Sequence, residues 1–212
     1  MPMEQQREPK HFSMIRGFHL ADFFTLANAA CGVGGVFLAM LYLQAGSRTH
    51  FYAAAAMAPL AFFFDWLDGN VARWRHQHSA LGRELDSLSD VISFGVAPAM
   101  VGYTLGLRGA WDMFCLTYFT VCGVSRLARF NVTAAELTNT VTGKVKYFEG
   151  TPIPTSIAIV LLLAVALWFD RVHDQLWFGW YRVGPGQFHP LVLVYVLSGS
   201  AMISATLRIP KP

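Results

Sequence analysis

The chain has 212 residues, of which 54% are hydrophobic and only 14% are charged. Because about 25% of the residues in soluble domains are charged, this composition argues against a soluble protein and favours a membrane protein. Lys and Arg total 16 against 13 Asp and Glu, without the long basic run that is typical of nucleic-acid binding. The three cysteines have no CxxC or metal-type spacing, so we expect neither a disulfide framework nor a zinc site.

The first 20 residues are predicted to lie on the cytoplasmic surface of the membrane. They lack the hydrophobic core of a cleavable signal peptide, so insertion depends on the first membrane span. Basic side chains are interspersed here with Phe12, Ile15 and Phe18. This mixture predicts a short amphipathic helix over 7–20 that lies along the membrane surface.

Six apolar segments follow, each within the range of about 17–25 residues that lets a helix cross a bilayer. They lie at 21–44, 51–73, 87–107, 111–130, 152–170 and 190–208. We therefore predict an all-α integral membrane protein with six transmembrane helices. Residues 1–212 would form a single domain, of which 21–208 are the helix bundle.

Basic residues are unequally shared between the two sides of the predicted bundle. With a cytoplasmic N-terminus, 12 Lys and Arg lie in the inner segments and 4 in the outer loops. This asymmetry follows the positive-inside rule. The sequence therefore predicts that both termini face the cytoplasm.

Two acidic side chains lie at the inner end of the second predicted span. Asp65 and Asp68 share one helical face with Gly69, Ala72 and Arg73, at offsets of 0, 3, 4, 7 and 8 residues. The two small residues leave room for a ligand beside this face. The guanidinium group at its end suits phosphate oxygens, which it contacts as a planar fork.

A matching set of residues lies at the start of the third predicted span. Gly82, Asp86 and Asp90 follow one another at intervals of four residues, which places them on neighbouring turns of one helix. A short polar turn joins this helix to the preceding one, so we expect the two helices to be antiparallel neighbours.

Four carboxylates that converge at one membrane surface repel one another unless cations lie between them. Hard oxygen ligands favour Mg²⁺ or Mn²⁺ over zinc, so the sequence predicts a mononuclear or dinuclear site for one of these ions. Two ions about 3.5–4 Å apart can stabilise the attacking and leaving oxygens of a phosphoryl displacement. The constellation therefore indicates a site for a diphosphate and a divalent metal.

This pattern of eight positions resembles the signature of the CDP-alcohol phosphotransferase family. It reads Asp65-x2-Asp68-Gly69-x2-Ala72-Arg73-x8-Gly82-x3-Asp86-x3-Asp90. The resemblance implies a six-helix membrane enzyme, usually a homodimer, whose cavity opens to the cytoplasm and binds a CDP-linked lipid or alcohol. It also implies two metal ions, with all four aspartates as ligands and Asp90 as the catalytic base as well.

Four shorter stretches resemble the membrane-type phosphatidylserine synthases of bacteria and archaea. They are FTLAN at 24–28, SFGVAPA at 93–99, RLARFNV at 126–132 and GTPIP at 150–154. This resemblance implies that CDP-diacylglycerol is the donor, that L-serine is the acceptor and that CMP is released. It further implies a location in a prokaryotic cytoplasmic membrane.

Arg126, Arg129 and Asn131 form a polar cluster at the inner end of the fourth predicted span, and we predict that they bind serine. The carboxylate of an amino acid needs such partners when it is partly desolvated. Alternatively, the arginines are anchors at a helix end and Asn131 is a helix cap.

The CDP-lipid is predicted to contact Gly69, Ala72, Arg73 and Gly82, together with two residues of the first span. Thr25 and Asn28 lie about one turn apart, and they either line the nucleotide pocket or form hydrogen bonds between helices.

Two other functions remain open from the sequence. Lys144 and Lys146 keep a phosphorylated acceptor possible, so glycerol phosphate, inositol or inositol phosphate are alternatives to serine. Acidic residues inside helices also mark ion pathways, which makes a cation transporter the second alternative. The acids here gather at one membrane surface, which favours an enzyme.

Overall fold

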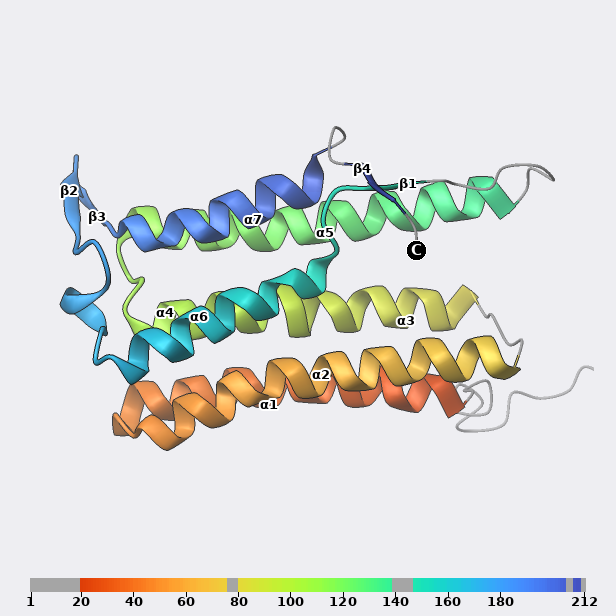
Figure 1. Ribbon diagram of the computed structural model, residues 1–212, viewed down its shortest axis with the longest axis horizontal. Helices are drawn as coiled ribbons and strands as arrows, with labels where there is room; N and C mark the ends of the chain where they lie inside the picture. Colours follow the sequence, from red (N-terminus) through yellow and green to blue (C-terminus); the bar gives the residue numbers. More distant parts are fainter. Residues whose placement is uncertain (1–19, 76–79, 139–146, 205–207, 211–212) are drawn as a thin grey trace, which may run out of the picture.

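The computed structural model describes residues 20–75, 80–138, 147–204 and 208–210. The amphipathic helix expected over 7–20 lies outside these residues, except for Leu20. Within them the chain is mainly helical, and the long helices run roughly parallel to one another (Figure 1). The all-α prediction is therefore confirmed.

The first two helices form a long hairpin. Helix α1 spans Leu20–Ala45 and α2 spans Arg48–Arg75, close to the two predicted spans. Gly46 ends α1 with a φ of 65° and donates its N–H to the carbonyl of Tyr42 at 2.8 Å. A glycine suits this position because a left-handed backbone is costly for residues with a Cβ atom.

The third predicted span is a continuous helical run in three parts. Helix α3 spans Ala80–Asp90, the π-helical segment η2 spans Val91–Val96, and α4 spans Ala97–Leu105. Pro98 lies in the first turn of α4, where its missing N–H and its ring disturb the regular hydrogen-bond ladder. The wider π turns come directly before this disturbance and directly after Asp90.

Helix α5 spans Ala110–Thr138 and extends two turns beyond the predicted end at residue 130. The additional turns contain Ala134, Ala135, Glu136 and Leu137, which favour helix without being a continuous apolar run. A hydropathy criterion therefore ends this helix too early.

The last two helices are shorter than predicted. Helix α6 spans Ser156–Trp168 after the 3-10 turn η3 at Ile153–Thr155, and α7 spans Leu193–Ile203 after η5 at Pro190–Val192. A further 3-10 turn, η4, spans His173–Gln175. The prediction of a helix up to residue 208 is wrong, because Ser204 is already extended, with φ −69° and ψ 123°.

Four short strands complete the described part. Strand β1 (Tyr147–Glu149) pairs antiparallel with β4 (Arg208–Pro210), and β2 (Tyr181–Val183) pairs with β3 (Gly186–Phe188). The first pair connects the segment before α6 to the segment after α7. The second pair forms a hairpin at the opposite end of the bundle (Figure 1).

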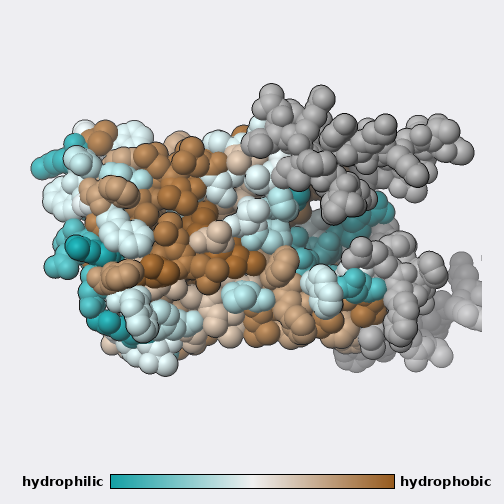
Figure 2. Space-filling view, in the orientation of Figure 1, coloured by the Kyte–Doolittle hydropathy of each residue, from teal (hydrophilic) through white to brown (hydrophobic). Residues whose placement is uncertain are grey.

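Two helical segments in the described part are long and apolar enough to cross a membrane, namely Ala21–Ala45 and Leu81–Leu105. The segments Ile153–Trp168 and Pro190–Ile203 are apolar but shorter, while α2 and α5 are long enough but less apolar than α1. Large apolar side chains nevertheless face outward on several helices, with exposed fractions of 62% for Phe37, 65% for Phe114 and 70% for Leu197. In Figure 2 hydrophobic residues cover the middle of the visible face, and hydrophilic ones gather at the end that carries β2 and β3.

The backbones of α1 and η2 approach each other closely. A Cβ atom on Gly32 would lie 2.5 Å from the Oγ atom of Ser93 and 2.8 Å from its Cα atom. The Ser93 hydroxyl also donates to the carbonyl of Asn28 at 2.8 Å. The two backbones can therefore approach only because residue 32 has no side chain.

We expect Gly32→Ala to destabilise the bundle by about 1–3 kcal/mol, because the added methyl group overlaps backbone atoms that cannot move independently. At about 2–4 °C per kcal/mol for a chain of this size, thermal unfolding in detergent should begin several degrees lower. Gly34→Ala is the control, since its Cβ atom would meet only the Met57 sulfur at 4.0 Å. Equal melting temperatures for the two variants would contradict this account of the contact.

Candidate metal centre

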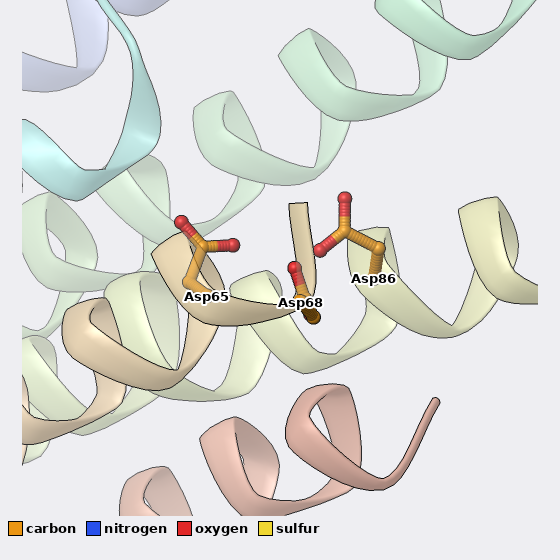
Figure 3. Close-up of side chains that lie close together, drawn as sticks. All are labelled: Asp65, Asp68 and Asp86. Carbon is orange, nitrogen blue, oxygen red and sulfur yellow. The ribbon is translucent and has the colours of Figure 1, made fainter. Parts of the chain in front are cut away.

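Three of the four predicted carboxylates converge between two helices. Asp65 and Asp68 project from α2 and Asp86 projects from α3, with one oxygen of each lying within 4.8 Å of the others. Figure 3 shows the three side chains turned toward a shared space. Asp68 is buried, and the other two are half-buried. The structure therefore brings together the acids that the spacing in the sequence had placed on two separate helices.

Helix α1 is the common support of the two helices that carry these acids. It packs along α2 and along α3, whereas direct backbone contact between α2 and α3 is sparse. The expected antiparallel arrangement is seen in Figure 1, and the acids of α2 and α3 lie next to one another although the two backbones are in little direct contact. The side chains of Asp65, Asp68 and Asp86 lie between the two helices.

Asp90 lies one turn further along α3, next to this group. Asp90 is 8% exposed, and the negative charges of Asp65 and Asp86 act on its carboxylate. The Nδ2 atom of Asn28 donates a hydrogen bond to its Oδ1 atom at 3.2 Å. Asp90 therefore belongs to the acidic site but has a neutral hydrogen-bond partner of its own.

Thr25 forms a second contact from α1 to the acids. Its hydroxyl donates to the Oδ2 atom of Asp68 at 2.7 Å. Of the two roles considered for Thr25 and Asn28, hydrogen bonding between helices is the one observed. Contact of either residue with a nucleotide stays a prediction.

The residues predicted to bind serine are placed differently from one another. Arg126 is half-buried on α5, with its guanidinium carbon 6.0 Å from the centre of the Phe130 ring and with Asp90 as a nearby opposite charge. Its Nε atom is buried without a hydrogen-bond partner among the described residues. Asn131 exchanges hydrogen bonds of 3.0 and 3.3 Å with the Ser87 hydroxyl. Arg129 is exposed, and Arg126 is the arginine of this group on which the charge of Asp90 acts.

The other positions predicted to contact the CDP-lipid, besides Thr25 and Asn28 of α1, lie along the two helices that carry the acids. A Cβ atom on Gly69 would meet no other atom within 4 Å, so this part of α2 borders open space. Gly82 lies one turn before Asp86 on α3 and is half-buried. Ala72 and Arg73 lie near the end of α2, and their side chains are outside the described part.

Sequence reasoning missed two polar residues beside the acids. Asp22 is 3% exposed on α1, and its charge acts on Asp68. Ser87 connects α3 to α5 through Asn131. A signal for Asp22 was present, because it precedes Thr25 by three residues, so that polar residues recur on neighbouring turns of an otherwise apolar helix.

The residues present fit a divalent metal ion. Carboxylate oxygens are the ligands that Mg²⁺ and Mn²⁺ prefer, and three of them are available within one small space. The Oδ1 atom of Asp86 is buried without a hydrogen-bond partner in the described residues, which is costly for a carboxylate unless a cation is near.

The chain belongs to the CDP-alcohol phosphatidyltransferase family, whose profile matches residues 18–188 and thus includes all four aspartates. A relative named CDP-diacylglycerol--serine O-phosphatidyltransferase, from the yeast Saccharomyces cerevisiae, is 43% identical over 95% of this chain and 74% of its own length. Its namesake from Helicobacter pylori is 38% identical over 60% of this chain and 52% of its own length. An archaetidylserine synthase from Methanothermobacter thermautotrophicus is 38% identical over 66% and 55%, respectively.

We expect Asp86→Asn to weaken Mn²⁺ binding at least about tenfold, since even outer partners of metal ligands contribute 10–100-fold to affinity. The signal of free Mn²⁺ in electron paramagnetic resonance measures binding without any turnover. Glu84→Gln is the matched control, because Glu84 is an exposed acid on the same helix and should leave affinity unchanged. Equal affinity of Asp86→Asn and the wild type would remove Asp86 from the metal site.

Proposed function

We propose that the protein is a metal-dependent phosphatidylserine synthase, which transfers the phosphatidyl group of CDP-diacylglycerol to L-serine and releases CMP. The observation that carries this proposal is the convergence of Asp65, Asp68 and Asp86, with Asp90 beside them. The family of the chain and the printed names of its relatives supply the donor and the acceptor. They do not favour another alcohol or a cation transporter.

In the proposed reaction the serine hydroxyl attacks the phosphorus atom that carries the diacylglycerol. A new bond forms between the serine oxygen and phosphorus, and the bond from phosphorus to the oxygen of CMP breaks. The proton of the hydroxyl passes to Asp90, which lies beside the three converging acids. Asp90 suits this role as a general base because it is buried beside the carboxylates of Asp65 and Asp86.

Asp65, Asp68 and Asp86 would hold the metal, with Asp90 as a further ligand. Bound Mg²⁺ or Mn²⁺, one ion or two, would offset the charge that develops on the diphosphate during displacement. The space beside Gly69 lets the diphosphate approach α2. Arg73, on the same helical face, is proposed to contact the phosphate oxygens.

Arg126 is proposed to bind the carboxylate of serine. It projects from α5 with a buried Nε atom that has no partner in the described residues, and a carboxylate would satisfy it. Asn131 and Ser87 hold α5 and α3 together at this level. Arg129 is the weaker candidate because it is exposed.

The membrane arrangement is part of the proposal. Six membrane-spanning helices, one domain, cytoplasmic termini and a cytoplasmic site are consistent with the distribution of basic residues and with the outward-facing apolar side chains. A homodimer follows from the family resemblance alone. The relatives come from yeast, bacteria and archaea, so they do not limit the protein to a prokaryotic membrane.

The reaction is tested by CMP release from CDP-diacylglycerol, with purified protein and Mn²⁺ or Mg²⁺. Serine, glycerol phosphate and inositol are offered in separate reactions. We expect release that depends on serine and on the metal, and that stops on addition of a chelator. Turnover with another alcohol but not with serine would overturn the assignment of the acceptor.

Asp90→Asn should lower kcat by about 10²–10⁴-fold, the usual contribution of a general base. Binding of Mn²⁺ should weaken less than in Asp86→Asn, because Asp90 lies outside the group of three acids. Stopped turnover with intact metal binding assigns the proton transfer to Asp90. If Asp90→Asn instead weakened Mn²⁺ binding as strongly as Asp86→Asn does, Asp90 would be chiefly a metal ligand.

Arg126→Ala should raise the KM for serine at least about tenfold, since an unpaired carboxylate loses a charge-assisted hydrogen bond of about 1.5–3 kcal/mol. Arg129→Ala is the matched control on the same helix and should change the KM little. Steady-state kinetics at saturating CDP-diacylglycerol distinguish the two. A larger effect at Arg129 would reverse the assignment.

A further inference from the structure

We propose that α1 sets the geometry of the cation site through two positioning residues, Thr25 and Asn28. Thr25 orients the carboxylate of Asp68, and Asn28 orients that of Asp90. The inference rests on the proposed function, because it concerns the same metal-dependent site. In this inference α1 aligns the carboxylates that α2 and α3 carry.

The packing of the helices makes such a support necessary. Direct backbone contact between α2 and α3 is sparse, while both pack along α1. The distance between the acids of α2 and those of α3 therefore depends on how each helix is seated on α1. The close contact of Gly32 with Ser93 determines how the continuous run of α3 and η2 lies against α1.

The Thr25 hydroxyl binds one oxygen of Asp68, a carboxylate that also accepts a hydrogen bond from the backbone of Gly69. Thr25 is 3% exposed, and its oxygen lies 2.7 Å from Asp68 Oδ2 and 3.3 Å from the carbonyl of Ala21. A hydroxyl has one proton, and the shorter contact to an ionised acceptor is the stronger. The Asp68 carboxylate is therefore held in one orientation, with one of its oxygens within 4.8 Å of those of Asp65 and Asp86.

Asn28 acts on Asp90 in the same way. It is completely buried, and its Nδ2 atom donates to Asp90 Oδ1 at 3.2 Å. Its backbone carbonyl is held by the Ser93 hydroxyl, so the amide is placed against the start of η2. Both donors are neutral, and they orient the carboxylates without offsetting the negative charge that attracts a cation.

Other threonines of the bundle show that Thr25 is not simply satisfied within its own helix. The Thr104 hydroxyl donates to the carbonyl of Val101 at 3.0 Å, and that of Thr117 donates to Met113 at 2.8 Å. Such bonds to the preceding turn are the usual solution for a hydroxyl in a helix. Thr25 instead makes its shorter bond to a carboxylate on another helix.

The test measures Mn²⁺ binding to the full chain in detergent, without CDP-lipid, by electron paramagnetic resonance of the free ion. Thr25→Val keeps the shape and removes the donor, so we expect its dissociation constant to rise at least about tenfold, as for other partners of metal ligands. Thr25→Ser keeps the hydroxyl and should recover most of the affinity. Thr104→Val is the matched control, because Thr104 is also completely buried, and it should bind as the wild type does.

Asn28→Leu is the second variant and should lower kcat for CMP release while the KM for serine stays nearly constant.

Equal Mn²⁺ affinity of Thr25→Val and the wild type would overturn the inference. Equal weakening in Thr104→Val would also overturn it, because the effect would then reflect general destabilisation. Absence of Mn²⁺ binding in the wild type would overturn it together with the metal site. Wild-type protein that binds Mn²⁺ but does not turn over serine would overturn only the proposed function.

Discussion

The mutual repulsion of four carboxylates in a largely apolar bundle is the constraint on which the rest of the structure depends. Asp65 and Asp68 on α2 and Asp86 and Asp90 on α3 lie close together, although like charges destabilise one another in a low-dielectric environment. A bundle tolerates this only if its helices are held by other contacts and if cations offset the charge. The packing of α2 and α3 along α1 holds the helices together. The carboxylate oxygens are suitable ligands for the cations that would offset the charge.

A buried acid at the opposite end of the bundle shows the contrasting case. Asp112 accepts hydrogen bonds from the backbone N–H groups of Gly109 and His189 at 2.8 Å, and its Oδ2 atom lies 2.6 Å from the His189 ring. It is fully paired within the protein and holds the start of α5 against the segment before α7. The acids between α2 and α3 lie beside one another, and Asp68 and Asp90 accept hydrogen bonds from neutral donors on α1, which is the arrangement expected of a functional site.

Much of the site could be predicted from residue types and spacing. Carboxylates at intervals of three or four residues must share a helical face, so Asp65 with Asp68 and Asp86 with Asp90 were predictable as pairs. Helix ends were less predictable. The last turns of α5 lack an apolar run, and α7 ends at Ile203 because the chain there leaves the bundle to pair β4 with β1. Strand pairing between distant segments has no local signal in the sequence.

The sequence by itself determined the chemistry: which side chains are acidic, which helix carries each, and which family the pattern resembles. Local periodicity is sufficient for this, because a helix places residues three or four apart on one side. Only the tertiary structure decided that α1 lies against both acid-bearing helices, that Thr25 and Asn28 donate hydrogen bonds to carboxylates, and that Arg126 lies near Asp90. These contacts join residues far apart in the chain, and they depend on how whole helices pack rather than on any short stretch of sequence.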